Sequence, residues 1–514
     1  MSNKKRRILP HIFRDRVIVA VLIVIQIAVL VLIAMSGANY SPYIAVGLNL
    51  ISFIISLVVI VRRTNDAYKL TWIYLILCFP VFGGLFYLVF SIQASMRLMA
   101  PYMKHIDEQT SIITAETKEC VSKAKSMFPE NRAQIAYLCD YAGFPIYDNT
   151  ETKYYPMGED FFQELLDELK RAEKYIFLEY FIIGEGKMWD SILDILKEKA
   201  QSGVKVRILY DDFGCIFNLP KKYPEKLAQY GIECRAFNRF RPILTGIQNN
   251  RDHRKICSID GRIAFTGGIN LADEYINEIE KYGRWKDAAV KIKGDAAWSL
   301  TVIFLKMWML TSPDPEITEN IVEYEPLKSE NKSDGFVHPY CDSPLDTDHV
   351  GEHIYMQIVN HAKDYLYIMT PYLIIDDSMM SALTLAAKSG VDVRIITPHK
   401  WDKKMVHITT RSYYSDLIDG GVRIYEYTPG FVHSKVFVSD DNIASIGTAN
   451  LDFRSLYLHF ECGTMLYGSR AVIEAKNDFL STLDECKEIT ADDCKVGVFM
   501  RFINSLMRLI APLL

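Results

Sequence analysis

The sequence lacks an excess of positive charge. Of its 514 residues, 58 are Lys or Arg and 63 are Asp or Glu, which gives a formal net charge of −5. Nucleic-acid binding draws much of its affinity from Lys and Arg placed against phosphates, so this balance argues against a nucleic-acid partner. Half of the residues are hydrophobic and 24% are charged, a composition that excludes a disordered chain.

Closely spaced cysteine pairs are also missing. The ten cysteines are scattered along the chain, and no Cys-x-x-Cys spacing occurs. Structural zinc sites and thioredoxin-like redox sites commonly need such pairs, so neither is predicted, and we expect no metal and no cofactor. Thiols without an evident disulfide framework favour, weakly, a reducing compartment.

The N-terminal 110 residues contain three long runs without a charged side chain. They cover residues 17–35, 43–61 and 70–92. Each run is long enough to cross about 30 Å of hydrocarbon as a helix, which predicts a multi-pass protein of the cell membrane. The third run contains Pro80, Gly83 and Gly84, which also suit a re-entrant segment. Lys and Arg ahead of the first run place the N-terminus in the cytoplasm, but the membrane face of the remaining chain stays open.

From about residue 112 the chain reads as a duplicated α/β fold. Strands are predicted at 175–181 and 204–210 around a helix at 189–202, and the same order returns at 365–371, 379–389 and 391–397. Residues 200–209, AQSGVKVRIL, match residues 387–396, AKSGVDVRII. A repeat of this length predicts two similar α/β/α units related by a pseudo-twofold axis. We place the first unit at 111–325, a polar linker at 326–350, and the second unit at 351–514.

Each unit carries one copy of the pattern His-x-Lys-x4-Asp. The copies are His253, Lys255 and Asp260 in the first unit, and His433, Lys435 and Asp440 in the second. Residues i and i+2 of a strand share a face, so each His projects beside its Lys. The two Asp residues have the opposite parity and adjoin turn formers. We therefore interpret them first as hairpin and scaffold residues of the catalytic motif.

Two histidines and two lysines in one cleft suit phosphoryl transfer. One neutral His attacks phosphorus, and the other protonates the leaving oxygen. The lysines, with Asn270 and Asn450 that follow small-residue pairs in the two units, are expected to hold the non-bridging phosphate oxygens. Each His also needs an acceptor that orients its ring. Asp287 follows His253 by 34 residues, and Glu461 follows His433 by 28, so these carboxylates are the candidates.

These paired motifs resemble those of the phospholipase D superfamily and, within it, the bacterial cardiolipin synthases. The resemblance runs from about residue 50 to the C-terminus and is carried by residues 71–90, 178–181, 253–275, 370–372 and 433–455. The chain departs from the pattern by the additional apolar run 17–35 ahead of the usual two. The resemblance implies two phospholipase D-like units that form one catalytic body behind N-terminal transmembrane helices.

The resemblance also implies a reaction. His253 attacks one phosphatidylglycerol, His433 protonates the departing glycerol, and a phosphatidyl-histidine forms. A second phosphatidylglycerol, with His433 as base, then yields cardiolipin. Phosphatidylglycerol and cardiolipin would thus be the membrane partners, without a nucleotide.

Three alternatives stay open at this stage. The same residues would serve phospholipase D hydrolysis or phosphatidyl transfer to another alcohol, and a non-catalytic membrane scaffold remains a third possibility. The C-terminal residues 496–514 are amphipathic. They either lie at the membrane interface or pack on the catalytic body.

Overall fold

The computed structural model of the chain describes most of its length. The described residues are 37–62, 65–79, 83–84, 86–87, 94–111, 118–239, 249–312, 319–328, 333–346 and 348–513. The predicted apolar run 17–35 lies outside these residues, as does much of the run 70–92.

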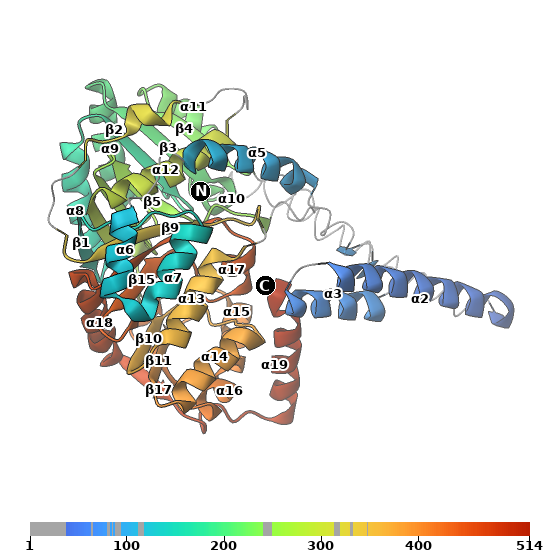
Figure 1. The fold of residues 1–514 in the computed structure, drawn as a ribbon. Helices are drawn as coiled ribbons and strands as arrows, with labels where there is room; N and C mark the ends of the chain where they lie inside the picture. Colours follow the sequence, from blue (N-terminus) through green and yellow to red (C-terminus); the bar gives the residue numbers. More distant parts are fainter. Residues whose placement is uncertain are drawn as a thin grey trace.

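Two mixed β-sheets form the body (Figure 1). The first sheet has the order β1-β8-β6-β5-β2-β3-β4, and the second has the order β17-β12-β11-β10-β14-β15-β16-β9. The first sheet contains β1 (Thr150–Tyr155), β2 (Tyr175–Tyr180), β3 (Lys205–Asp211), β4 (Glu233–Phe237), β5 (Lys255–Ile259), β6 (Ile263–Gly267) and β8 (Ala289–Gly294). The second contains β9 (Phe336–Asp342), β10 (Tyr365–Met369), β11 (Asp392–Pro398), β12 (Arg423–Tyr427), β14 (Val436–Ser439), β15 (Ile443–Gly447), β16 (Glu461–Tyr467) and β17 (Cys486–Ile489).

The strand orders confirm the duplication. The run β8-β6-β5-β2-β3-β4 corresponds strand for strand to β16-β15-β14-β10-β11-β12, and parallel and antiparallel pairs fall at the same places. The six elements predicted around the repeated segment are present, with ends shifted by at most two residues. The predicted two-unit α/β fold is therefore correct.

Helices cover the sheets and fill the space between them. They are α2 (Gly37–Val61), α3 (Asp66–Cys78), α5 (Ala94–Ser111), α6 (Lys118–Met127), α7 (Arg132–Ala136), α8 (Gly158–Arg171), α9 (Lys187–Gln201), α10 (Asp212–Cys215), α11 (Tyr223–Ala228), α12 (Ala296–Leu310), α13 (Val350–His361), α14 (Asp377–Lys388), α15 (Lys404–Ser412), α16 (Tyr414–Asp419), α17 (Phe453–Tyr457), α18 (Arg470–Leu483) and α19 (Val498–Ile510). Helix α12 is apolar on all sides and almost wholly buried, as expected of a central helix.

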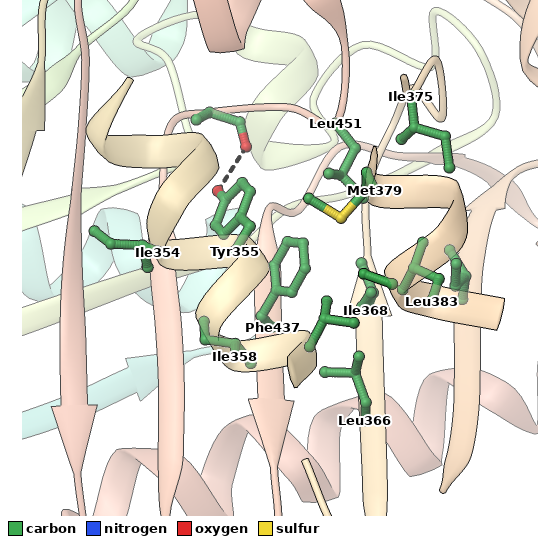
Figure 2. Packing of buried hydrophobic residues seen from close by; sticks show 14 of the residues in the cluster. Ile354, Tyr355, Ile358, Leu366, Ile368, Ile375, Met379, Leu383, Phe437 and Leu451 are labelled. Atoms are coloured by element: carbon green, nitrogen blue, oxygen red, sulfur yellow. Dashed lines mark hydrogen bonds between the residues drawn. The ribbon is translucent and has the colours of Figure 1, made fainter. Parts of the chain in front are cut away.

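The two units share one apolar core. Ile256 and Val290 from the first sheet lie in the same buried cluster as Val436 and Leu466 from the second. Burying a side chain of this size stabilises a fold by about 1.5–3 kcal/mol, so a shared cluster holds the units in a fixed relation. The second unit has a core of its own, in which the ring of Tyr355 stacks on Phe437 with centroids 4.0 Å apart (Figure 2).

The predicted boundaries between the units need correction. Residues 336–342, placed in the linker 326–350, form β9, which pairs with β16 at the edge of the second sheet. Pro339 lies within β9, and an edge strand tolerates a proline because one side of it makes no ladder hydrogen bonds. Residues assigned to the first unit also belong elsewhere: Ala124 and Leu138, before β1, are buried in the core of the second unit.

The N-terminal helices project from the second unit beside α19 (Figure 1). The predicted run 43–61 lies in α2, and the start of the run 70–92 lies in α3. Among the described residues, no helix meets the combined requirements of length and apolar character for a membrane span, so the predicted spans are not confirmed. Helix α3 is joined to α19 by a hydrogen bond from Thr71 Oγ1 to the carbonyl oxygen of Leu509, 2.6 Å long.

Asp260 and Asp440 hold hairpins. Each lies directly after the strand that carries its motif, with a positive φ of 53° and 54° respectively. The Asp260 carboxylate accepts hydrogen bonds from the backbone N–H groups of residues 173–175, and Asp440 accepts the equivalent bonds from residues 363–365. The hairpin interpretation is confirmed. A direct catalytic role is not supported, because each Asp lies at the end of its strand away from the histidine.

We predict that Asp260→Ala and Asp440→Ala lower stability rather than the intrinsic rate. Each change leaves three backbone donors without their acceptor, at a cost of about 1–3 kcal/mol. Urea unfolding measures the loss, and activity is then expressed per folded molecule. Asp→Asn, which keeps one acceptor oxygen, provides the milder control. A rate per folded molecule that falls by orders of magnitude would show that these residues have a direct catalytic role.

Candidate active site

The motifs meet where short strands cross from one unit to the other. β7 (Arg284–Lys286) of the first unit pairs in parallel with β13 (Gly430–Val432) of the second, with Lys286 opposite Val432. His433 follows β13 directly, and its backbone N–H donates to the Lys286 carbonyl. A parallel bridge between Asp252 and Phe460 repeats this arrangement on the other side, so His253 comes next to residue 461.

This pairing exchanges the orienting carboxylates between the units. His253 Nδ1 lies 2.9 Å and 3.0 Å from the two carboxylate oxygens of Glu461, and His433 Nδ1 lies 2.6 Å from Asp287 Oδ2. An ionised carboxylate only accepts, so each Nδ1 carries the proton and each Nε2 keeps its lone pair. The sequence identifies both carboxylates, but its spacings associate each with the His of its own unit. The structure corrects this association.

The two lysines of the motifs also belong to this site. The ammonium groups of Lys255 and Lys435 each donate to the carbonyl of the His two residues earlier. Burial lowers the pKa of Lys255 to about 8 and that of Lys435 to about 7, and the negative charges of Glu461 and Asp287 oppose both shifts. Each lysine therefore senses the carboxylates of both units, which means that the two motifs form one site.

Both histidines are neutral near pH 7. Burial lowers the pKa of His253 to about 3 and that of His433 to about 4, although Glu461 and Asp287 act in the opposite direction. The carboxylate contacts engage Nδ1 of each ring, and among the described residues no hydrogen bond reaches either Nε2. A neutral imidazole with an available Nε2 is the form that attacks phosphorus.

The walls around the histidines differ between the units. The ring of His253 lies 5.0 Å from that of Phe181, centroid to centroid. The ring of His433 has three aromatic neighbours at 5.3–6.0 Å: Trp285, Tyr275 and Phe431. These side chains exclude water and account for the low pKa values of both imidazoles.

The two asparagines are close to the motifs but are already engaged. Asn270 Oδ1 accepts from the backbone N–H of Ile182, and its Nδ2 donates to the hydroxyl of Tyr275. Asn450 Nδ2 lies 3.2 Å from Asp452 Oδ2, while its buried Oδ1 has no hydrogen-bond partner among the residues that the structure describes. Their predicted role on phosphate oxygens remains a prediction.

Supporting residues that the sequence reasoning did not identify surround the first His. Arg254 donates to the Glu461 carbonyl and lies 3.6 Å from the buried Glu179. Thr448 donates to Glu461 Oε2 and so fixes the carboxylate that orients His253. Thr448 belongs to the small-residue pair that precedes Asn450, and this position is the signal for its role.

His459 is a further residue of the site that the sequence reasoning does not identify. Its Nδ1 lies 3.7 Å from Glu461 Oε1, and its ring centroid is 5.6 Å from that of His253. Within the described part of the chain, His253, His459 and Glu461 are the one group of side chains arranged to hold a metal ion. His459 lies two residues before Glu461, the first residue of β16, and this period-2 spacing is a signal for its placement.

Comparisons with known proteins identify the class. Residues 165–308 and 355–483 match a family model described as cardiolipin synthase, phospholipase D-like domain, and residues 51–91 match one described as phospholipase D-nuclease N-terminal. The solved phosphatidylserine synthase of Haemophilus influenzae shares the fold, with a TM-score of 0.56 at 15% identity over 73% of this chain and 98% of that one.

Curated sequences narrow the class. Cardiolipin synthase 2 of Bacillus anthracis is 36% identical over 90% of each chain. A cardiolipin synthase of Alkalihalophilus pseudofirmus is 35% identical over 90% of this chain and 92% of that one, and an uncharacterized Streptococcus mutans protein is 43% identical over 87% and 96%. The chain belongs to the cardiolipin synthase family of phospholipase D-like proteins.

The lysine pKa values predict a fall of activity in mild alkali. As the pH rises through about 7 and about 8, Lys435 and then Lys255 lose the charge that holds a phosphate. In Lys435→Arg the charge persists, because the pKa of Arg lies above about 12. We therefore expect the alkaline limb of kcat/KM to move from about 7 toward about 8, where Lys255 sets it. An unmoved limb would assign it to another group.

Proposed function

We propose that the protein is a phosphatidyltransferase that makes cardiolipin and glycerol from two molecules of phosphatidylglycerol. The observation that carries this proposal is the exchanged pair of His–carboxylate contacts, beside two buried lysines. Membership of the cardiolipin synthase family supports the choice of substrate. The reaction exchanges one phosphodiester for another, so it needs no nucleotide.

In the first half-reaction, Nε2 of His253 attacks the phosphorus of one lipid. The P–N bond forms as the P–O bond to glycerol breaks, and His433 donates the proton that the leaving oxygen needs. The negative charge of a bound phosphodiester raises the pKa of His433 above about 4, which supplies the imidazolium. Lys255 and Lys435 stabilise the charge on the non-bridging oxygens.

In the second half-reaction, His433 accepts a proton instead of donating one. His433, now neutral, removes the proton from the hydroxyl of a second phosphatidylglycerol, whose oxygen attacks phosphorus and releases His253. Asp287 holds the imidazolium of His433 in its orientation, and Glu461 does the same for His253. Water or another alcohol would enter by the same steps, so the choice of acceptor depends on what reaches the site.

The first test supplies phosphatidylglycerol vesicles without nucleotide and follows cardiolipin and glycerol. His253→Ala and His433→Ala are expected to slow transfer by at least about 10³-fold. A phosphatidyl ester of nitrophenol, which leaves without protonation, separates their roles. His433→Ala should release a burst of nitrophenol and retain lipid on His253, whereas His253→Ala should release none.

The controls decide between the alternatives. Added serine, ethanolamine or water as preferred acceptor would replace the cardiolipin proposal with another phosphatidyl transfer or with hydrolysis. The reverse burst pattern would make His433 the nucleophile. Unchanged transfer in both variants would contradict the site itself.

We also propose that the protein is a multi-pass protein of the bacterial cell membrane, and that its lipid-facing group comprises α2, α3 and α19. Exposed apolar side chains support this: Leu50, Phe53 and Leu57 on α2, Leu70, Tyr74 and Leu77 on α3, and Val498, Phe499 and Phe502 on α19. Phe499 is 76% exposed, and a group of exposed apolar side chains that includes such a ring is unfavourable in water. The Thr71–Leu509 bond keeps α19 beside α3.

We predict that α19 lies in the lipid interface. A tryptophan introduced as Phe499→Trp should be quenched by brominated phosphatidylglycerol when the protein is in vesicles, measured as the difference from the parent protein. Ile473→Trp provides the matched control, because Ile473 is an exposed apolar residue of α18, on the other side of the second unit (Figure 1). Equal quenching at both positions, or none at residue 499, would contradict the lipid-facing group.

A further inference from the structure

His459 has no role in the proposed reaction, yet it lies in the heart of the site. Its side chain is only 12% exposed, and neither ring nitrogen has a hydrogen-bond partner within the described residues. Leaving both polar atoms of a ring without a partner away from water costs free energy, so such a group calls for an explanation. The segment between α17 and β16 holds this ring against the carboxylate of Glu461.

Three donor atoms converge at this point. One ligand atom each from His253, His459 and Glu461 lie within 4.8 Å of one another. Zinc binds imidazole nitrogen and carboxylate oxygen at about 2.0–2.2 Å, so two ligands of a tetrahedral site lie about 3.4 Å apart. The three donor atoms lie within 4.8 Å of one another, so binding requires the side chains to close by on the order of 1 Å.

The donor set selects the kind of cation. Two imidazoles and one carboxylate form the ligand set of many zinc sites that keep a fourth position open. Magnesium and calcium prefer oxygen ligands, so they are poor occupants. Thr448, which donates to Glu461 Oε2, orients the carboxylate from behind, as outer residues do at metal sites. The positive charges of Lys255 and Lys435, which interact with Glu461, oppose a cation at this site.

We propose that His253, His459 and Glu461 form an inhibitory binding site for Zn²⁺ or a similar transition-metal ion. The cation takes the lone pair of His253 Nδ1, the nitrogen that now donates to Glu461. The displaced proton moves, through solvent, to Nε2, so the ring stays neutral but changes tautomer. The nitrogen that should attack phosphorus then carries a hydrogen and has no lone pair to offer. The inhibitory consequence rests on the proposed function, whereas the binding does not.

Binding is tested first without any assay of activity. The full-length protein in detergent or nanodiscs is titrated with Co²⁺, whose visible absorption reports tetrahedral nitrogen and oxygen ligands. We expect His459→Asn to lose this absorption or to weaken Co²⁺ affinity by at least about tenfold, since even losing an outer residue costs about 10–100-fold. His361→Asn, a histidine of α13 bonded to its own helix, is the matched control and should bind as the parent does.

Inhibition is tested with buffered free Zn²⁺ on phosphatidyl transfer, each variant relative to its own rate without metal. The parent and His361→Asn should be inhibited, with recovery on chelation, and His459→Asn should need at least about tenfold more Zn²⁺. Mg²⁺ should not replace Zn²⁺. Equal sensitivity of His459→Asn, or an unchanged Co²⁺ spectrum in it, would overturn the site. A Co²⁺ spectrum that depends on His459 in a protein without transferase activity would instead contradict the proposed function alone.

Discussion

The contact of each catalytic imidazole with a carboxylate from the other unit is the constraint on which the site depends. It requires that β7 lie beside β13 and that residue 252 lie beside residue 460, since these pairings bring each His next to its acceptor. The shared apolar core keeps the two sheets in the necessary relation. Packing between the units is therefore part of the chemistry, because a shift of one unit would separate both imidazoles from their orienting groups at once.

Burial gives the site its electrostatic character. It depresses the pKa values of two histidines and two lysines. Glu461 and Asp287 remain ionised because His253 and His459 hold the pKa of Glu461 low, and His433 and Lys435 hold that of Asp287 low. At neutral pH the two imidazoles are therefore neutral, and Lys435 is only partly charged. The negative charge of a phosphodiester that enters the site favours the protonated forms of His433 and the two lysines. These are the forms that donate the proton and hold the phosphate oxygens.

Much of this was predictable from sequence because the duplication made each motif appear twice. The α/β class, the six repeated elements and the two His–Lys pairs follow from strand periodicity and from matching spacings. The exchange of Asp287 and Glu461 was not predictable, since sequence distance carries no information about which unit supplies a neighbour. The polar composition of residues 326–350 indicated a linker and not the edge strand β9. His459 was not identified because the other motif has no equivalent histidine. Hydrophobic length alone likewise did not establish membrane spans.

The exchanged carboxylates also bear on how such a chain arises. A unit that carries a His, a Lys and a carboxylate cannot orient its own imidazole, but two identical units around a true twofold axis would each supply what the other lacks. Fusion of two such copies into one polypeptide preserves the reciprocal supply while freeing the copies to diverge. The unequal surroundings of His253 and His433 in this chain, one beside a third imidazole and the other among three aromatic rings, are the form that such divergence takes.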